Sequence, residues 1–347
     1  MSVRPVKLGV VAAVAVALIS LVSSANVSAV VEWEFVEESV SLGMSGVSPH
    51  VEKVAGGDRV WRSGVMPAGT AVSLCTDAGA CTSETLTATG AGAVVDYTVA
   101  QAPSGLRAYF KRIDPSSNTQ AVYSAPCTTA DCLSFGAATI TSTGMQVSKD
   151  VKAWGVPDPV RLPDGRVRIY IVESPVPGKC MEKVASYISS DGISFTKESG
   201  WRLEGGYGDT EVLRAKDGDW VMILADLACT ASNNQKLFVT TSTDGLKWAE
   251  PQVLTGAGEF KFDPTGYEVS TNVFRIYYAA EAVPASANPA IKRGIMRIKE
   301  TPAGGVGVTK TPTATTPASK SKSITCVKGK TVRKVTGTTC PKGFKKK

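Results

Sequence analysis

Histidine is almost missing from this chain of 347 residues, which contains only His50. The sequence therefore argues against a Ser-His-Asp triad and against a zinc site built on histidines. Leucine is also scarce and no long segment shows helical periodicity, whereas glycine and threonine are plentiful. This pattern predicts an all-β protein.

Long apolar runs are missing after the first residues. The run from Leu8 to Val22 follows two basic residues and precedes several small ones, an arrangement typical of an export signal. We predict a signal peptide over residues 1–29 and a secreted, extracellular or cell-wall-associated protein. A membrane anchor is the alternative, although the run is short for a span of about 20 residues.

Acidic residues are missing after Glu300, where the chain still holds 11 Lys or Arg. Residues 30–300 contain 25 basic and 31 acidic residues, so a domain of net charge −6 precedes a tail of +11. Such a tail favours an anionic cell envelope as partner, and nucleic acid is not expected. A merely solubilising tail is the alternative. We expect a monomer.

Eight cysteines in an exported chain favour disulfides over metal. Two pairs are close enough in sequence to staple hairpin loops, one pair would close the tail, and the remaining two would form a long-range bridge. These pairs are Cys75 with Cys81, Cys127 with Cys132, Cys326 with Cys340, and Cys180 with Cys229.

A repeat with a period near 50 residues organises the chain. Each copy opens with a polar residue, turns, and continues into an alternating strand rich in aromatic residues. The clearest copies are GVPDPVRLPDGRVRIYIV from Gly155, GDTEVLRAKDGDWVMILAD from Gly208 and FDPTGYEVSTNVFRIYYA from Phe262; the weaker ones are VVDYTVAQAPSGLRAYFKRI from Val94 and GVSPHVEKVAGGDRVWRSG from Gly46.

The second half of the unit repeats as well. SSDGISF from Ser189 and STDGLKW from Ser242 share a Ser-x-Asp-Gly-x-x-aromatic pattern. Asp-Gly between strands predicts a hairpin with a type I′ turn, which needs positive φ at both central residues. In the first two units the loops CTDAGAC and CTTADC stand at this place, so a disulfide would close the same hairpin there.

Five units that cannot bury their faces alone must pack around an axis, so residues 30–300 are predicted to form a five-bladed β-propeller. The segment WEFVEESVSL from Trp33 could supply the strand that closes the ring. A two-sheet sandwich with a second domain is the alternative. Residues 301–323 are a Thr/Pro/Ser/Gly linker, and residues 324–347 are a small basic module supported by its two cysteines.

The blade pattern, with Asp-Pro opening inner strands, resembles the five-bladed propeller glycosidases of the arabinanase, levansucrase and invertase kind, as in glycoside hydrolase families 43 and 32. The resemblance covers roughly residues 31–300. The Ser-x-Asp-Gly turns are similar to the Asp boxes of sialidases, which are structural. The tail resembles the short two-cysteine basic ends of exported actinobacterial proteins.

The resemblance implies a bound carbohydrate and a set of catalytic carboxyl groups. Asp158 matches the family's middle Asp, which tunes a pKa and holds the sugar, and Glu211 matches the general acid one blade later. The first-blade Asp, the base or nucleophile, is absent. Ser48 is assigned to its place, with His50 and Glu52 nearby as imperfect substitutes.

Glycoside cleavage needs one protonated and one ionised carboxyl group, and inner strands converge on the mouth of an axial channel. We expect a ring of acids there, made of Asp96, Asp158, Asp209 or Glu211, and Asp263. Crowded like charges would raise at least one pKa. The alternative is that these acids hydrogen-bond to backbone amides and tie blade to blade. A structural calcium ion is a further alternative, although no Asp-x-Asp-x-Asp-Gly loop supports one.

Asp158 and Glu211 are thus the candidate catalytic residues. The candidate substrate-binding residues are Asp96, Trp154, Asp209, Asp263 and His50, with Trp154 placed to stack on a sugar ring. No cofactor is predicted. Two functions remain open: a carbohydrate-binding propeller that could also be a glycoside hydrolase, or a non-catalytic surface propeller that binds a partner while the tail tethers it.

Overall fold

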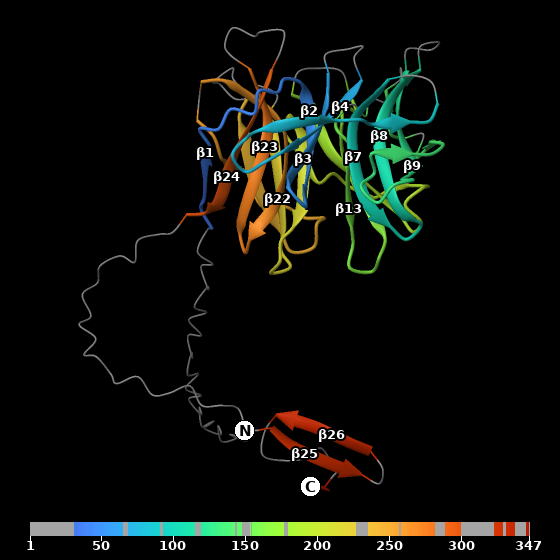
Figure 1. Cartoon of the computed structure of the whole chain (residues 1–347), viewed down its shortest axis with the longest axis vertical. Helices are drawn as coiled ribbons and strands as arrows, with labels where there is room; N and C mark the ends of the chain where they lie inside the picture. Colours follow the sequence, from blue (N-terminus) through green and yellow to red (C-terminus); the bar gives the residue numbers. More distant parts are fainter. Residues whose placement is uncertain are drawn as a thin grey trace, which may run out of the picture. The chain divides into compact units, whose positions relative to one another are not determined.

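A computed structural model describes residues 31–64, 69–90, 93–114, 119–142, 144–147, 153, 155–176, 180–226, 235–256, 258–281, 289–299, 323–328, 331–336 and 345–346. The protein is all-β, as predicted, and forms a five-bladed β-propeller (Figure 1). Within the described ranges, no helix has the length and apolar character needed to cross a membrane.

Each blade is one antiparallel sheet, built in sequence order from the propeller axis outwards. The strands of the five blades are β2 (Val47–Val54), β3 (Gly57–Ser63), β4 (Thr70–Cys75) and β5 (Cys81–Glu84); β7 (Val94–Ala102), β8 (Gly105–Asp114) and β9 (Thr119–Pro126) with β11 (Thr139–Ile140) and β12 (Gln146–Val147); β13 (Asp158–Arg161), β14 (Val167–Glu173) and β15 (Lys183–Ser189) with β16 (Thr196–Lys197) and β17 (Leu203–Glu204); β18 (Tyr207–Arg214), β19 (Trp220–Asp226), β20 (Leu237–Ser242) and β21 (Gln252–Val253); and β22 (Phe260–Ser270), β23 (Val273–Glu281), β24 (Ala290–Ile298) and β1 (Trp33–Glu37). A short parallel pair, β6 (Thr87–Ala88) with β10 (Ser134–Phe135), joins blades 1 and 2.

The ring closes with the strand that the sequence placed first. β1 pairs antiparallel with β24, from Trp33 opposite Ile298 to Glu37 opposite Gly294, and so becomes the outer strand of the fifth blade (Figure 1). This confirms the prediction for the segment from Trp33. The N-terminal strand therefore completes a sheet made of the last three strands of the propeller, which ties the two ends of this unit together.

The core lies between adjacent blades, in five clusters of buried apolar side chains. The second strand of each blade is buried on both faces because a neighbouring blade covers each side, and strand side chains alternate between the two faces. Tyr170, Trp220 and Tyr277 belong to this core and are 0%, 2% and 0% exposed. Large aromatic side chains fill these wedge-shaped interfaces with few residues.

Disulfides close the outer loops of the first two blades, and Asp-Gly loops follow the third strands of the next two, as the sequence suggested. Disulfides join Cys75 to Cys81 and Cys127 to Cys132. Cys180 is also disulfide-bonded, while its predicted partner Cys229 lies outside the described residues. Cys340, which the sequence predicts to bridge to Cys326 in the tail, also lies outside the described residues.

The Asp-Gly hairpins differ from the predicted turn type. Gly192 and Gly245 have φ of +76° and +70°, but neither preceding aspartate has positive φ, so these are not type I′ turns. Instead, the Asp191 carboxylate accepts hydrogen bonds from the N–H groups of the two residues after the glycine, at 2.7 and 3.0 Å. The glycine carbonyls face the preceding blade, where Tyr109 and Tyr170 donate hydrogen bonds to them.

The chain divides into two compact units, one ending at Lys299 and one beginning at Glu300. In the second unit, β25 (Ser323–Lys328) pairs with β26 (Thr331–Thr336) and with β27 (Lys345–Lys346), both antiparallel. The predicted signal peptide and most of the linker lie outside the described residues.

Candidate functional site

One residue of each inner strand stands at the same level around the propeller axis. The level is fixed by the pairing with the second strand, where these residues lie opposite Trp61, Tyr109, Tyr170, Ile223 and Tyr277. We call this set the axial ring; it consists of His50, Thr98, Asp158, Glu211 and Thr265. It brings together both predicted catalytic residues, from adjacent blades.

Side chains of the axial ring hydrogen-bond from blade to blade around the whole circle. In four of the five steps, the side chain accepts the backbone N–H that follows the ring residue of the next blade. These bonds run from Val99 to His50 Nε2 (3.3 Å), Val212 to Asp158 Oδ2 (2.6 Å), Gly266 to Glu211 Oε1 (3.1 Å) and Val51 to Thr265 Oγ1 (3.3 Å).

In the remaining step, between blades 2 and 3, a proline prevents this hydrogen bond. The residue that follows Asp158 is Pro159, which has no N–H to donate. Thr98 therefore reverses the direction and donates its hydroxyl to the carbonyl of Pro157 at 3.0 Å. The circle of hydrogen bonds is therefore complete. Asp158 and Glu211 join adjacent blades through it, as the structural alternative from the sequence proposed.

Burial dominates the electrostatics of the two carboxyl groups. Asp158 and Glu211 are 6% and 7% exposed. Burial raises the pKa of Glu211 to about 8, although hydrogen bonds from Gly266 and Thr265 act in the opposite direction. Burial, and next the charge of Glu211, raises the pKa of Asp158 well above its usual range. Burial therefore favours the protonated form of both groups, and Glu211 is mostly protonated near neutral pH.

His50 occupies the place in the first blade that matches Asp158 and Glu211. Sequence reasoning assigned Ser48 to this place, but the pairing of β2 with β3 sets His50 opposite Trp61. Burial lowers the pKa of His50 to about 4, so the ring is neutral near pH 7. Its Nε2 accepts the Val99 N–H, and its buried Nδ1 has no hydrogen-bond partner among the described residues.

The other predicted acids form a second ring, two residues before the axial ring. An extra residue bulges from the inner strand in four blades, and the first residue within this register shift has positive φ: 48° at Ser48, 53° at Asp96, 44° at Asp209 and 50° at Asp263. Aspartate tolerates this left-handed conformation better than most residues, which gives these acids a conformational role. We call these four residues the bulge ring.

Residues of the bulge ring bond mainly to each other. Asp263 accepts the Ser48 N–H at 2.7 Å, across the seam between blades 5 and 1. Asp209 and Asp263 also hydrogen-bond to each other, which requires a shared proton; burial and the charge of Asp209 raise the pKa of Asp263 well above its usual range. Asp96 pairs with the buried Lys111 at 3.3 Å. The single ring of acids expected from the sequence is thus divided into two.

A cavity of about 570 Å³ opens on the propeller axis, on the side of the axial ring where the inner strands end. His50, Asp158 and Glu211 line it, together with the following residues of the inner strands, and no bulge-ring residue does. Leu106, just after the turn between β7 and β8, also lines it, so the cavity opens on the face that carries the turns between first and second strands. Its volume lies in the range of small-ligand sites, roughly 300–1,000 Å³.

Sequence reasoning did not identify several residues of this site. Thr98 and Thr265 complete the axial ring, and Lys53 and Arg214 line the cavity. Counting back eleven or twelve residues from each second-strand residue at this level would have found the ring members. Trp154, predicted to stack on a sugar, lies outside the described residues.

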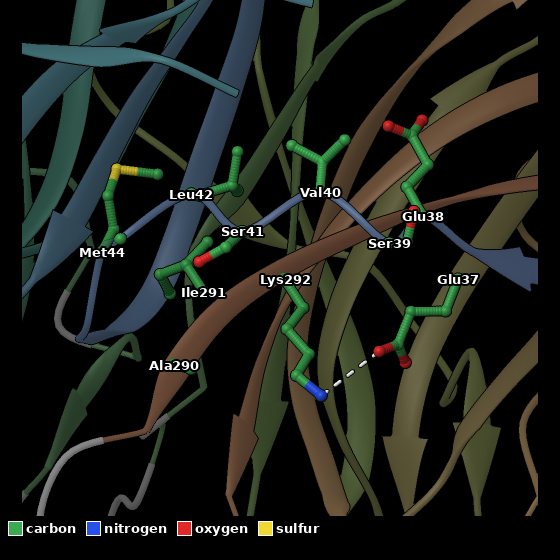
Figure 2. A pocket seen from close by; sticks show the side chains of 11 residues that line it. Glu37, Glu38, Ser39, Val40, Ser41, Leu42, Met44, Ala290, Ile291 and Lys292 are labelled. Atoms are coloured by element: carbon green, nitrogen blue, oxygen red, sulfur yellow. Dashed lines mark hydrogen bonds and ion pairs between the residues drawn. The ribbon is translucent and has the colours of Figure 1, made fainter. Parts of the chain in front are cut away.

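A second cavity, of about 310 Å³, lies beside the closing strand. It is lined by the segment from Glu37 to Met44 and by Ala290, Ile291 and Lys292 of β24 (Figure 2). Glu37 binds Lys292 at 3.2 Å and accepts the Tyr278 hydroxyl at 2.5 Å, so its carboxylate is already engaged in the fold. Across the part of the chain that the structure describes, no group of three or more His, Cys, Asp or Glu is arranged to hold a metal ion.

The fold is a five-bladed β-propeller, and proteins of solved structure share it. The protein is similar to a thermostable family-43 glycoside hydrolase (11% identity, 76% of this chain and 96% of that one, TM-score 0.57) and to the endo-arabinase of Bacteroides thetaiotaomicron (9%, 77% and 99%, 0.55). It is also similar to an N-acetylgalactosamine deacetylase from F. plautii in complex with blood group B trisaccharide (13%, 73% and 90%, 0.52). No family model and no curated protein sequence matches. At these identities the likeness shows the fold, and the chemistry must be argued from the site.

Proposed function

We propose that this protein binds carbohydrate in the axial cavity without cleaving glycosidic bonds. The observation that carries the proposal is the composition of the axial ring: two buried carboxyl groups line the cavity, and the first blade contributes His50 where a third carboxyl group would stand. The scaffold is glycosidase-like, and the F. plautii structure named above contains a bound trisaccharide.

The ring holds a candidate acid but no suitable base. A pKa of about 8 suits Glu211 as a proton donor near neutral pH. Hydrolysis also needs an ionised carboxylate, for water activation or direct attack. The raised pKa of Asp158 works against that role, and its Oδ2 already accepts the Val212 N–H. Protonated carboxyl groups and neutral His50 can instead exchange hydrogen bonds with sugar hydroxyls.

Calorimetric titration combined with a reducing-sugar assay tests this proposal. We expect wild type to bind fragments of at least one of arabinan, fructan, xylan and mannan and to release no sugar from any of them. Glu211→Gln should bind with an affinity within about twofold of wild type, because glutamine replaces a mostly protonated carboxyl group of the same shape. Sugar release by wild type that Glu211→Gln abolishes would establish a hydrolase instead.

We further propose that the protein is exported as a monomer and held at an anionic cell envelope by its basic tail. The support is the segregation of charge, −6 over residues 30–300 and +11 beyond residue 300. Deleting residues 301–347 is expected to move most of the protein from the envelope fraction to the medium, while glycan binding in the axial cavity persists. Envelope association that survives the deletion, or that resists about 1 M salt, contradicts electrostatic tethering.

A further inference from the structure

The mouth of the axial cavity is formed by four equivalent residues. Each lies three positions after an axial-ring residue, at the end of an inner strand, and all four line the cavity. These mouth residues are Lys53, Gln101, Arg161 and Arg214, from blades 1 to 4. Three of the four are cationic.

Two of the mouth residues keep their charge available. Lys53 is engaged, because it binds Asp58 at 3.1 Å and Asp77 at 3.5 Å. Arg161 and Arg214 are exposed at adjacent blades, and neither has an acidic partner among the residues that the structure describes. The Arg214 guanidinium lies over the Trp220 ring, 5.0 Å from its centroid, which orients the group.

Three acids, Glu52, Asp158 and Glu211, line the cavity. Burial raises the pKa of Glu52, as it does for Asp158 and Glu211. Burial therefore favours the uncharged forms of the acids in the cavity, while two arginines, Arg161 and Arg214, line its mouth. A guanidinium group binds carboxylate, sulfate and phosphate through paired hydrogen bonds.

We propose that the ligand of the axial cavity is an acidic saccharide, whose carboxylate, sulfate or phosphate group is held at the mouth by Arg161 and Arg214 while its hydroxyls contact the axial ring. This inference rests on the carbohydrate binding proposed above and specifies its ligand class. The propeller as a whole carries a charge of −6, which repels anions. A preference for an acidic glycan must therefore arise locally, at these two arginines.

Titration of the full mature chain with matched glycans tests the proposal. The probes are an oligogalacturonate, its methyl ester with the same backbone and no charge, and sulfated and phosphorylated oligosaccharides of the same length, which identify the anionic group. At low salt we expect at least one acidic probe to bind about tenfold or more tightly than the methyl ester. The double variant Arg161→Gln with Arg214→Gln should lose about 10–100-fold in affinity for that probe and about twofold or less for neutral glycans.

Arg166→Gln is the matched control, because Arg166 is an exposed arginine on the same face that binds Asp164 at 2.7 Å and does not line the cavity. It should leave every affinity unchanged. Equal binding of acidic and neutral glycans by wild type overturns the acidic-ligand proposal alone, as does an equal loss in the double variant and in Arg166→Gln. Absence of binding to any glycan, the neutral fragments included, overturns the proposed function as well.

Discussion

Asp58→Ala is expected to lower the free energy of unfolding of the propeller by about 3–5 kcal/mol, because it leaves buried charged and polar partners without their acceptor. Asp58 is fully buried at the start of β3 in blade 1. It accepts the hydroxyls of Tyr277 at 2.6 Å and Tyr267 at 2.7 Å, and it binds Arg275 at 3.2 Å, all from blade 5. The substitution thus acts at the seam where the ring closes. Urea unfolding followed by tryptophan fluorescence measures the loss.

The pKa of Asp58 supports this expectation. Burial raises it, but the hydrogen bonds from Tyr277, Tyr267 and Lys53, together with the charge of Lys53, outweigh burial and hold the pKa below its usual value. Asp77→Ala is the control: Asp77 binds the same Arg275 at 2.6 Å, but its side chain is 71% exposed, so solvent screens the pair and its loss should change the free energy of unfolding far less than Asp58→Ala does. Asp58→Asn keeps the shape and one acceptor and should fall between the two. Equal effects of Asp58→Ala and Asp77→Ala would refute a structural role for the buried carboxylate.

The architecture could be read from the sequence because its signals are local and repeated. The five copies near Gly46, Val94, Gly155, Gly208 and Phe262 each begin the inner strand of one blade. Short loops between close cysteines allowed the two hairpin disulfides to be paired from spacing alone. Closure by the first strand followed from the geometry of a ring, which leaves one outer strand position to fill.

The position of each acid along the propeller axis could not be predicted in the same way. Asp96, Asp158 and Asp263 all precede an alternating strand, so the sequence treats them as equivalent. A bulge adds one residue to the inner strand at Asp96 and at Asp263 but not at Asp158, and this shift depends on pairing with the second strand. Pairing is a long-range property, and a shift of one residue exchanges the two faces of a strand.

The same limit applies to the first-blade position. Ser48 shares its positive φ with Asp96, Asp209 and Asp263. His50, in contrast, matches Asp158 and Glu211 in its pairing with the second strand of the blade. Hydrogen bonds between blades, such as that from the Val99 N–H to His50, join residues about 50 positions apart, so only the assembled ring reveals them.

Wild type is expected to lose stability between about pH 6 and pH 9, and Glu211→Gln to remove about 2–3 kcal/mol of that loss. In the folded state Glu211 has a pKa of about 8, whereas in the unfolded chain it ionises near its ordinary value of 4.5. Between these two values the folded state binds more protons than the unfolded state. Stability therefore falls as pH rises through this window and levels off above about pH 8. Urea unfolding at both pH values measures the difference.

Asp158→Asn should act in the same direction, because the raised pKa of Asp158 has the same sign, but the two effects should not add. The charge of Glu211 contributes to the pKa of Asp158, so removing one carboxyl group relieves the other. Glu204→Gln is the control, since Glu204 is a surface glutamate whose side chain is 59% exposed, bound to Lys183 at 2.7 Å. It should leave the pH dependence of wild type intact. If Glu211→Gln also leaves that dependence intact, Glu211 is ionised in the folded protein, and the ring then holds a charged carboxylate that could serve as the base for hydrolysis.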